Sequence, residues 1–424
     1  MEMELLAALT GAVGTLLKAF SGYFIAIALF AFFKERGFKR SPPKTRFAAL
    51  IAARNEEAVI SGIVESLKNQ DYPPELCDIY VIPNNCKDGT ETAALAAGAK
   101  IIRCRRPVRY KGDALNQAFE ELANMEYDAF CVFDADNIAS PAFLSEMNDA
   151  FASGALVCKG RRMAKNPYDS ATAGCYAIYF ELFNIFFNRA RSRLGLSAKI
   201  DGTGFAVTRK AVEILGGWKT SAITEDAEFA AQLAYAGIRV AWVPRAVTYD
   251  EQPTSPPESV IQRMRWCSGL IDVAKLRLPA LLSRRRAAPR AGAGERCLRF
   301  DSFMILISPV IQLVSLIPAI LAPVFRLLSG KLEILPVLAA LAVLYTVVAA
   351  FAAALSAYAG YGLRRMARSV PAFPLFMASW LPILVAAFFR RTSSWREMRR
   401  AAALPQRAEE RRRAAPRAPV ARGA

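Results

Sequence analysis

Histidine is absent from all 424 residues of this chain. This absence excludes a histidine general base, a nucleophile activated by histidine and a zinc ion held by imidazole ligands. The eight cysteines are scattered, and no two have the CxxC spacing of a zinc site or a redox dithiol. A proton acceptor in an active site would therefore be a carboxylate, and a metal held by carboxylates would be a hard ion such as Mg2+ or Mn2+.

Negative charge is also scarce, because 37 acidic residues stand against 55 basic ones and leave a formal net charge of +18. Such an excess favours a partner of opposite sign, namely anionic lipid, phosphate or nucleic acid. Hydrophobic residues make up 54% of the chain and are concentrated toward its two ends. The length allows more than one domain.

The N-terminal apolar stretch, residues 5–33, is long enough to span a bilayer although it contains Lys18. A cleaved signal peptide is the alternative, but the start is acidic and the basic residues follow the apolar stretch, at 34–44. Those basic residues predict that this end of the span lies in the cytoplasm.

Three more apolar stretches follow the central part of the chain, at residues 300–328, 332–363 and 370–389. The first two are of spanning length, whereas prolines interrupt the third and basic residues flank both of its ends. We therefore expect three true spans, with residues 370–389 lying in or re-entering the cytosolic leaflet. The predicted division is an N-terminal helix and linker (1–44), an α/β domain (45–280), a basic connection (281–299), C-terminal membrane segments (300–391) and a basic, disordered tail on anionic lipid (392–424).

From Phe47 onward, short strands alternate with helices, which predicts a parallel, doubly wound α/β sheet. We expect the first helix to open at residues 54–57, with Asn55 as its cap. One helix is expected to run through residues 168–193, and two short strands are expected on either side of Pro244.

One apolar strand, Phe130–Phe133, ends in two carboxylates one residue apart, Asp134 and Asp136. Open α/β sheets bind ligands at the carboxyl ends of their strands, and alternate residues of an extended chain point the same way. Two acids this close repel each other unless a cation lies beside them, so the pair predicts a divalent metal site. The alternative is a solvated loop with two ordinary acids. A second polar strand end, Asn84–Asn85, would lie at the same edge and could share the ligand.

Two helices carry further polar motifs. Thr224–Asp226 opens one of them, with Thr224 as the expected cap. In the other, Gln262, Arg265 and Trp266 project from one face because their spacing is i, i+3 and i+4. The alternative is structural, with Trp266 packed in the interior and Arg265 extended toward water.

Together, these motifs resemble those of the membrane-embedded family 2 glycosyltransferases, the group containing cellulose, chitin, hyaluronan and poly-N-acetylglucosamine synthases. The resemblance covers roughly residues 47–272, and the order of the flanking membrane segments also fits. Each motif is weak alone, whereas all of them in this order make chance a poor explanation. The matching motifs are Ala53–Glu56, Lys111–Asn116, Asp134–Asp136, Thr224–Asp226 and Gln262–Trp266.

The resemblance implies a GT-A fold, a Rossmann-like α/β domain that binds a nucleotide sugar, with Mg2+ or Mn2+ as the cofactor. It implies that Asp226 is the general base, that Glu225 supports it and that Asp136 binds the metal. Where relatives often carry two aspartates, this chain has Asn84–Asn85, so the uridine lacks a charged contact, although an asparagine oxygen can still accept from an imide N–H. The implied nucleotide site is Ala53, Glu56, Asn85, Asp88, Lys111 and Asp134, and the implied acceptor and diphosphate site is Gly202, Thr203, Gln262, Arg265 and Trp266.

The activity implied is inverting transfer of glucose or N-acetylglucosamine from a UDP-sugar to a growing β-glycan at the membrane. Two alternatives stay open: a single transfer to a lipid acceptor, as in ceramide glucosyltransferase-like proteins, and an inactive nucleotide-sugar-binding membrane subunit. The expected partners are a UDP-sugar, a glycan or lipid acceptor and membrane lipids, but not nucleic acid. The expected location is a prokaryotic plasma membrane with the catalytic domain in the cytosol, and the oligomeric state stays open.

Overall fold

An eight-stranded sheet forms the centre of the protein in its computed structural model, which describes residues 2–35, 37–283, 293–330 and 333–390. The strand order is β3-β2-β1-β4-β7-β6-β8-β5. The strands are β1 (Phe47–Ala53), β2 (Cys77–Pro83), β3 (Lys100–Ile101), β4 (Ala129–Asp134), β5 (Ile138–Ala139), β6 (Val157–Ala164), β7 (Phe205–Thr208) and β8 (Val240–Asp250).

The sheet is parallel on one side and mixed on the other. Strands β3, β2, β1 and β4 run parallel, β7 is antiparallel to both β4 and β6, and β5 is antiparallel to β8. The prediction of a mostly parallel α/β sheet is confirmed, and β7 and β5 are its antiparallel strands. A buried strand has the same apolar pattern whichever way it runs, so the sequence does not reveal the direction of β7.

Helices cover both faces of the sheet, and the residues of β1 alternate between the two cores. Ala49 and Ile51 pack with α2, α3 and α5, while Ala48 and Leu50 pack with α4 and α9. All seven residues of β1 are buried, as expected for a strand covered on both faces. These helices are α2 (Ile60–Lys68), α3 (Thr90–Ala96), α4 (Lys111–Glu121), α5 (Phe143–Ala152), α8 (Arg209–Ile214) and α9 (Glu225–Tyr235).

The expected helix start at Asn55 is wrong. Helix α2 begins only at Ile60, and Asn55 has a φ of 54°, in the left-handed region. The side-chain oxygen of Asn55 accepts the backbone N–H of Lys87 at 2.7 Å, so it joins two loops instead of capping a helix.

The two short strands expected around Pro244 are one strand, β8. Its pairing with β6 changes register between Gly160 and Arg161, so that Val243 pairs with Gly160 and Val247 with Arg161. Pro244 lies in this irregularity, where the lack of an N–H breaks no ladder bond. A Cβ atom on Gly160 would lie 2.2 Å from the carbonyl oxygen of Ala246, so only glycine fits there.

The long helix expected over residues 168–193 is present but irregular. It consists of α6 (Ala171–Leu182), a π-helical segment (Phe183–Arg189) and α7 (Ala190–Arg193). The wider π turn accommodates extra residues without ending the helix. Further along the chain, α10 (Pro256–Leu282) is the helix expected to carry Gln262, Arg265 and Trp266.

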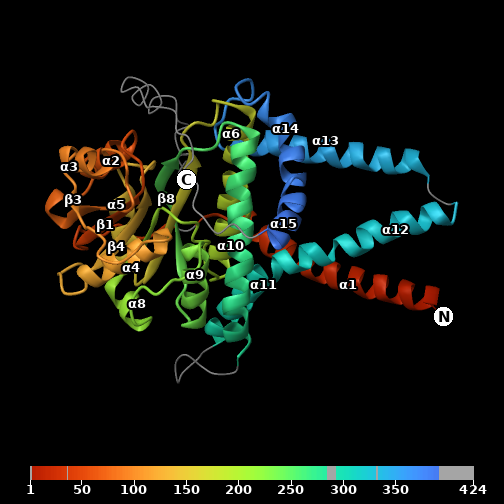
Figure 1. Cartoon of the computed structure of the whole chain (residues 1–424), viewed down its shortest axis with the longest axis horizontal. Helices are drawn as coiled ribbons and strands as arrows, with labels where there is room; N and C mark the ends of the chain where they lie inside the picture. The colour runs from red at the N-terminus through yellow and green to blue at the C-terminus, as the bar shows by residue number, and fades with distance from the viewer. Residues whose placement is uncertain (1, 36, 284–292, 331–332, 391–424) are drawn as a thin grey trace.

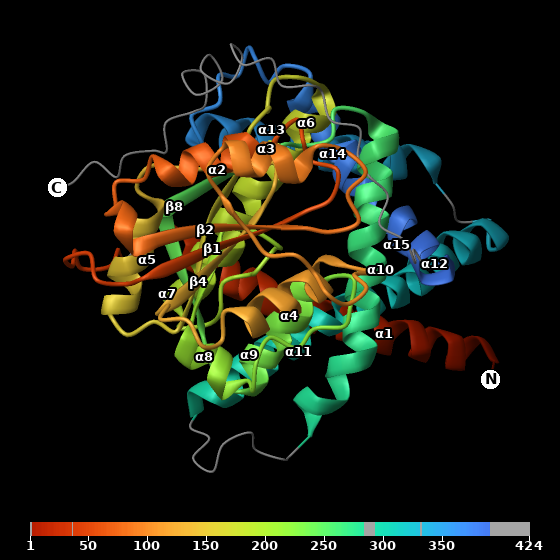
Figure 2. The ribbon, with the colours of Figure 1, turned by 60° about the vertical axis from the view of Figure 1, so that its left-hand side comes forward.

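The membrane-associated helices leave the α/β domain in two directions (Figures 1 and 2). In Figure 1, α1, α12 and α13 extend to the right, away from the domain, whereas α6, α10, α14 and α15 run across that direction. Helix α14 packs on α6, and α15 packs on α10. The bounds are α1 (Glu2–Ala28), α11 (Ala293–Val314), α12 (Leu316–Leu328), α13 (Ile334–Tyr358), α14 (Ser369–Ala378) and α15 (Trp380–Phe389).

Four helical stretches are long and apolar enough to cross a membrane: Gly11–Phe32, Gly294–Leu321, Ile334–Tyr358 and Ser369–Phe389. The expectation that the last of them does not cross stays a prediction. The basic connection expected at 281–299 is shorter than predicted because α10 continues to Leu282 and α11 begins at Ala293. The expected basic tail lies outside the described residues.

Candidate active site

A cavity opens at the carboxyl ends of the central strands, where the sequence predicted a ligand. The ends of β4 and β8, the start of α9 and one face of α10 line this cavity. Ten predicted site residues line this cavity: Glu56, Lys111, Asp134, Asp136, Gly202, Glu225, Asp226, Gln262, Arg265 and Trp266. The other four predicted residues, Ala53, Asn85, Asp88 and Thr203, are outside its lining.

Lys111 stands at the start of α4 and reaches across the cavity floor. Its ammonium group donates to the carboxylate of Asp134 and, at 2.6 Å, to the carbonyl oxygen of Gly202. Burial opposes the charge of Lys111, but the carboxylates of Asp134 and Glu225 outweigh it and raise the pKa of the lysine. A cation held in this way is ready to face a diphosphate.

The glycine after Lys111 lets α4 approach Thr220 and the start of α9. A Cβ atom on Gly112 would lie 2.6 Å from Thr220 Oγ1 and 3.0 Å from the Cβ of Glu225. A larger residue would therefore push α4, and Lys111 with it, away from Glu225.

Asp136 lies just beyond β4 and is 6% exposed. Asn137 donates to its Oδ1 at 3.2 Å, and Thr203 accepts the backbone N–H of Asp134 at 3.1 Å. Thr203 thus fixes the strand end from below the cavity, which explains why it is a support and not part of the lining.

Sequence reasoning missed an ion pair in the cavity wall. Arg162 in β6 donates to Asp250 Oδ2, with 2.9 Å from its Nε. Burial, opposed by Arg162 and reinforced by Asp136, raises the pKa of Asp250 to about 6. The available signal was the two consecutive arginines, Arg161 and Arg162, inside an otherwise buried strand.

The two acids at the start of α9 line the cavity, where Glu225 is buried and Asp226 is half-buried. Burial raises the pKa of Glu225 to about 8, with Lys111 opposing and Asp226 adding to the rise. Burial also raises the pKa of Asp226, although the N–H of Ala227 acts the other way. The N-terminus of α9 favours the carboxylate of Asp226, but burial outweighs this effect. Thr224 holds the expected cap position, but no described residue bonds to its buried hydroxyl.

The polar face of α10 closes the cavity, as its spacing predicted. Gln262 is buried, whereas Arg265 and Trp266 are half-buried. Further along α10, a Cβ atom on Gly269 would lie 2.3 Å from Thr224 Cγ2, so glycine allows the helix to press on the loop before α9.

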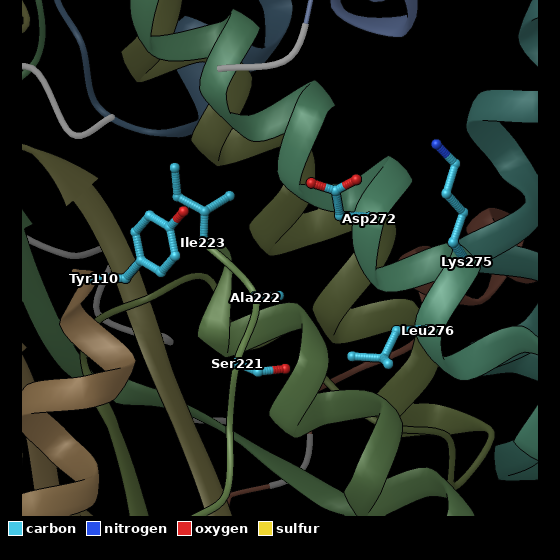
Figure 3. Close-up of a pocket in the computed structure, with 7 residues that line it drawn as sticks. All are labelled: Tyr110, Ser221, Ala222, Ile223, Asp272, Lys275 and Leu276. Carbon is cyan, nitrogen blue, oxygen red and sulfur yellow. The ribbon is translucent and has the colours of Figure 1, made fainter. Parts of the chain in front are cut away.

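Beyond this crossing lies a second cavity (Figure 3). Asp272 and Leu276 of α10 line it, and Tyr110 and Ile223 line both cavities. It contains none of the predicted site residues.

The residues expected around the nucleoside are largely committed to loop structure. Asn84 is buried, accepts from Arg54 at 3.0 Å and donates to the carbonyl oxygen of Ala53 at 2.9 Å. Asn85 is exposed and donates to the carbonyl oxygen of Val108 at 2.8 Å. Burial opposes ionisation of Asp88, but hydrogen bonds from Thr90 and other donors prevail and lower its pKa. Arg54 thus holds the side chain of Asn84 in the loop, whereas the predicted nucleotide-site residue is Asn85.

Comparisons with known proteins agree with this architecture. The chain is 31% identical over 252 residues to a probable glycosyltransferase, YdaM, of Bacillus subtilis, covering 55% of this chain and 59% of the relative. It is 28% identical to a beta-monoglucosyldiacylglycerol synthase of Synechocystis, covering 54% and 48%. The chain thus spans about half the length of the curated relatives it matches.

The structure is also similar to that of the mannosyltransferase PcManGT from Pyrobaculum calidifontis, which was solved with GDP-mannose and Mn2+. The TM-score is 0.63 at 18% identity, and the match covers 91% of this chain and 98% of that one. This likeness confirms the expected GT-A fold. Residues 42–269 match the family model described as glycosyltransferase like family 2. Because the match covers more than half of its residues, this chain belongs to glycosyltransferase family 2.

Proposed function

We propose that the protein is an inverting glycosyltransferase that moves glucose or N-acetylglucosamine from a UDP-sugar to a membrane-borne acceptor. The observation that carries this proposal is the meeting of Lys111, Asp136, Asp226 and Arg265 in one cavity. These side chains supply two cations, a metal-binding carboxylate and a base. An inactive binding subunit would have no need of all four.

The residues present fit a divalent ion that arrives with the diphosphate. Among the residues described, no group of three acids, histidines or cysteines could hold a metal by itself. Mg2+ and Mn2+ are commonly held by one or two carboxylates together with substrate phosphates, so Asp136 is sufficient as the protein ligand. Once bound, the ion would stabilise negative charge on the leaving diphosphate.

The remaining chemistry follows from the charges of the cavity. As the bond from the anomeric carbon to the diphosphate breaks, Lys111 and Arg265 face the developing negative charge. Asp226 accepts the proton of the attacking acceptor hydroxyl, since the chain has no histidine for this role. A single displacement inverts the anomeric carbon, so an α-linked donor gives a β-linked product.

Uridine recognition falls to Asn85 under this proposal. Its amide nitrogen is committed to Val108, but among the described residues no donor bonds to its carbonyl oxygen. That oxygen can accept the imide N–H of a uracil ring. The contact is neutral, and the exposed position of Asn85 leaves room for the base beside the cavity.

The arrangement of the membrane helices favours a lipid acceptor over the growing β-glycan expected first. A polymer needs a protein-lined path, yet none of the span window in α13 is buried, and only 11% is buried in each of the windows that begin at Gly11 and Gly294. In Figure 1 these helices extend away from the α/β domain, and among the described residues their apolar faces are mostly open. A lipid needs only a lateral approach along the membrane surface.

Product analysis tests this proposal. The purified protein is incubated with each of several UDP-sugars and with vesicles that contain hydroxyl-bearing lipids such as diacylglycerol. We expect a lipid that carries one β-linked hexose. Chains that lengthen at saturating donor would instead support the β-glycan synthase, and no transfer with any UDP-sugar would contradict the donor class.

A further inference from the structure

The α14–α15 segment is one apolar helical stretch that is interrupted at Ser379, and a residue of α10 supplies the hydrogen bonds at this interruption. Apolar surroundings offer no water to carbonyl groups freed by such a break, so protein donors must supply the hydrogen bonds. The carbonyl oxygen of Phe376 accepts from Ser379 Oγ at 2.7 Å and from Arg263 at 3.1 Å. Arg263 also donates to Ser379 Oγ at 2.7 Å.

Arg263 belongs to α10, the helix that carries Gln262, Arg265 and Trp266. It is 4% exposed, and its guanidinium carbon lies 4.4 Å from the ring centroid of Phe376 and 5.4 Å from that of Trp380. Both the hydrogen bonds and the ring contacts of Arg263 therefore fix the same few residues of the α14–α15 segment. This arginine is the one charged residue of the Gln262–Trp266 motif with no place in the cavity.

The α14–α15 segment in turn contacts Trp266, which lines the cavity. The ring of Trp380 stacks on Trp266 with centroids 6.2 Å apart and an angle of 18° between the planes. Tyr179 stacks on Trp380 at 5.4 Å, and Tyr176 meets the edge of Trp266 at 6.1 Å. These distances are within the range of favourable ring pairs. Trp266 thus reaches the cavity from an aromatic cluster to which Trp380 of the α14–α15 segment contributes.

The α14–α15 segment also has a buried side and an exposed side. Phe373, Phe376 and Leu384 are buried against the domain, whereas Leu375 and Phe389 are 66% and 79% exposed. Exposed apolar side chains on a helix that packs along α10 suit contact with lipid. The α14–α15 segment therefore supports Trp266 of α10 and also carries exposed apolar side chains.

We propose that the α14–α15 segment supports α10 behind the acceptor site, and that Arg263 and Trp380 are positioning residues that orient Trp266 toward the head group of a membrane lipid. This inference rests on the proposed function, because it assumes that an acceptor stacks on Trp266. Arg263 fixes the break, the break fixes Trp380, and Trp380 supports the face of Trp266.

The test compares Trp380→Ala and Trp380→Phe with Phe389→Ala, which removes an exposed ring from the same α14–α15 segment. Two rates are measured in vesicles: transfer to lipid, and hydrolysis of the UDP-sugar by water without an acceptor. We expect Trp380→Ala to raise the acceptor KM and to lower the ratio of transfer to hydrolysis about tenfold, the size of a lost ring contact. Trp380→Phe should restore most of the ratio, and Phe389→Ala should keep the wild-type ratio.

A second variant separates positioning from folding. Arg263→Lys keeps the charge but loses the fork that serves two acceptors, so it should give the same selective loss as Trp380→Ala. The inference is overturned if Trp380→Ala keeps the wild-type ratio, or if transfer and hydrolysis fall together in the folded variants. If the wild-type protein extends a glycan instead of a lipid, the proposed acceptor is wrong, and the same ratio measured with that glycan still decides the role of Trp380.

Discussion

At the scale of single residues, Glu225 and Asp226 are neighbours in the chain with different surroundings. Glu225 is 6% exposed and faces Lys111, whereas Asp226 is half-buried and lies near Gly202, where a Cβ atom would be 3.8 Å from its Oδ2. An acceptor hydroxyl in the cavity can therefore reach Asp226 more readily. The glutamate is placed to adjust the charge of the cavity floor.

This difference predicts unequal effects of two isosteric substitutions. Asp226→Asn removes the proton acceptor and should lower kcat about a hundredfold, the usual cost of losing a general base, while UDP still binds. Glu225→Gln should cost much less. Turnover and UDP affinity of the purified variants check this expectation, and the assignment of roles is wrong if Glu225→Gln is the more damaging change.

The raised pKa of Glu225 also predicts a pH dependence of stability. Burial holds the proton on this carboxyl in the folded chain up to about pH 8, whereas its ordinary value is 4.5. Unfolding between these values releases a proton, so the free energy of unfolding falls as the pH rises through this window. Glu225→Gln should flatten the dependence of Tm on pH between 5 and 8, while Glu120→Gln, at an exposed position, should not. Parallel Tm curves for the wild type and Glu225→Gln would contradict the burial argument.

At the scale of elements, the sequence was sufficient for those whose pattern is local. The strand before Asp134, the α10 face and the helix after Thr224 could all be predicted because apolar runs, spacing and caps reside in neighbouring residues. The direction of β7, the late start of α2 and the continuity of β8 depend on partners far along the chain. So does the Arg162–Asp250 pair, whose members are 88 residues apart.

One such long-range contact holds the loop before α9. Glu228 is fully buried, and its Oε2 accepts the N–H groups of Ser221 at 2.7 Å and Ala222 at 2.8 Å, while Arg277 of α10 pairs with its other oxygen. Glu228→Gln keeps the shape but weakens these charged hydrogen bonds, so kcat should fall about tenfold. Gln232→Ala on the same helix, which loses only one bond to the loop, is the control. Equal kcat values for Glu228→Gln and the wild type would show that the loop does not need this anchor.

At the scale of the whole molecule, the α/β domain lies to one side of the helices α1, α12 and α13, and the α14–α15 segment runs across their direction (Figure 1). The basic residues that follow α1 and those that flank α14–α15 predict three crossings, with α14–α15 on the cytosolic leaflet.

The topology predicts which introduced cysteines a membrane-impermeant reagent can reach. Ser329→Cys, between α12 and α13, should be labelled from outside intact cells. Arg390→Cys, which follows α15, should be labelled only after the cells are opened. A native thiol contributes no outside signal if the parent has its exposed Cys297 replaced by serine. Labelling of Arg390→Cys from outside would show that the α14–α15 segment crosses the membrane.

UDP formation from a UDP-sugar by the purified protein, with Mg2+ or Mn2+ and with excess chelator, tests the metal-assisted transfer most directly. We expect UDP to be formed with the metal and the chelator to stop it. Asp136→Ala should abolish UDP formation in a protein that still folds, because Asp136 lies beyond the end of β4. An undiminished rate in excess chelator, or in Asp136→Ala, would contradict metal-assisted transfer at Asp136.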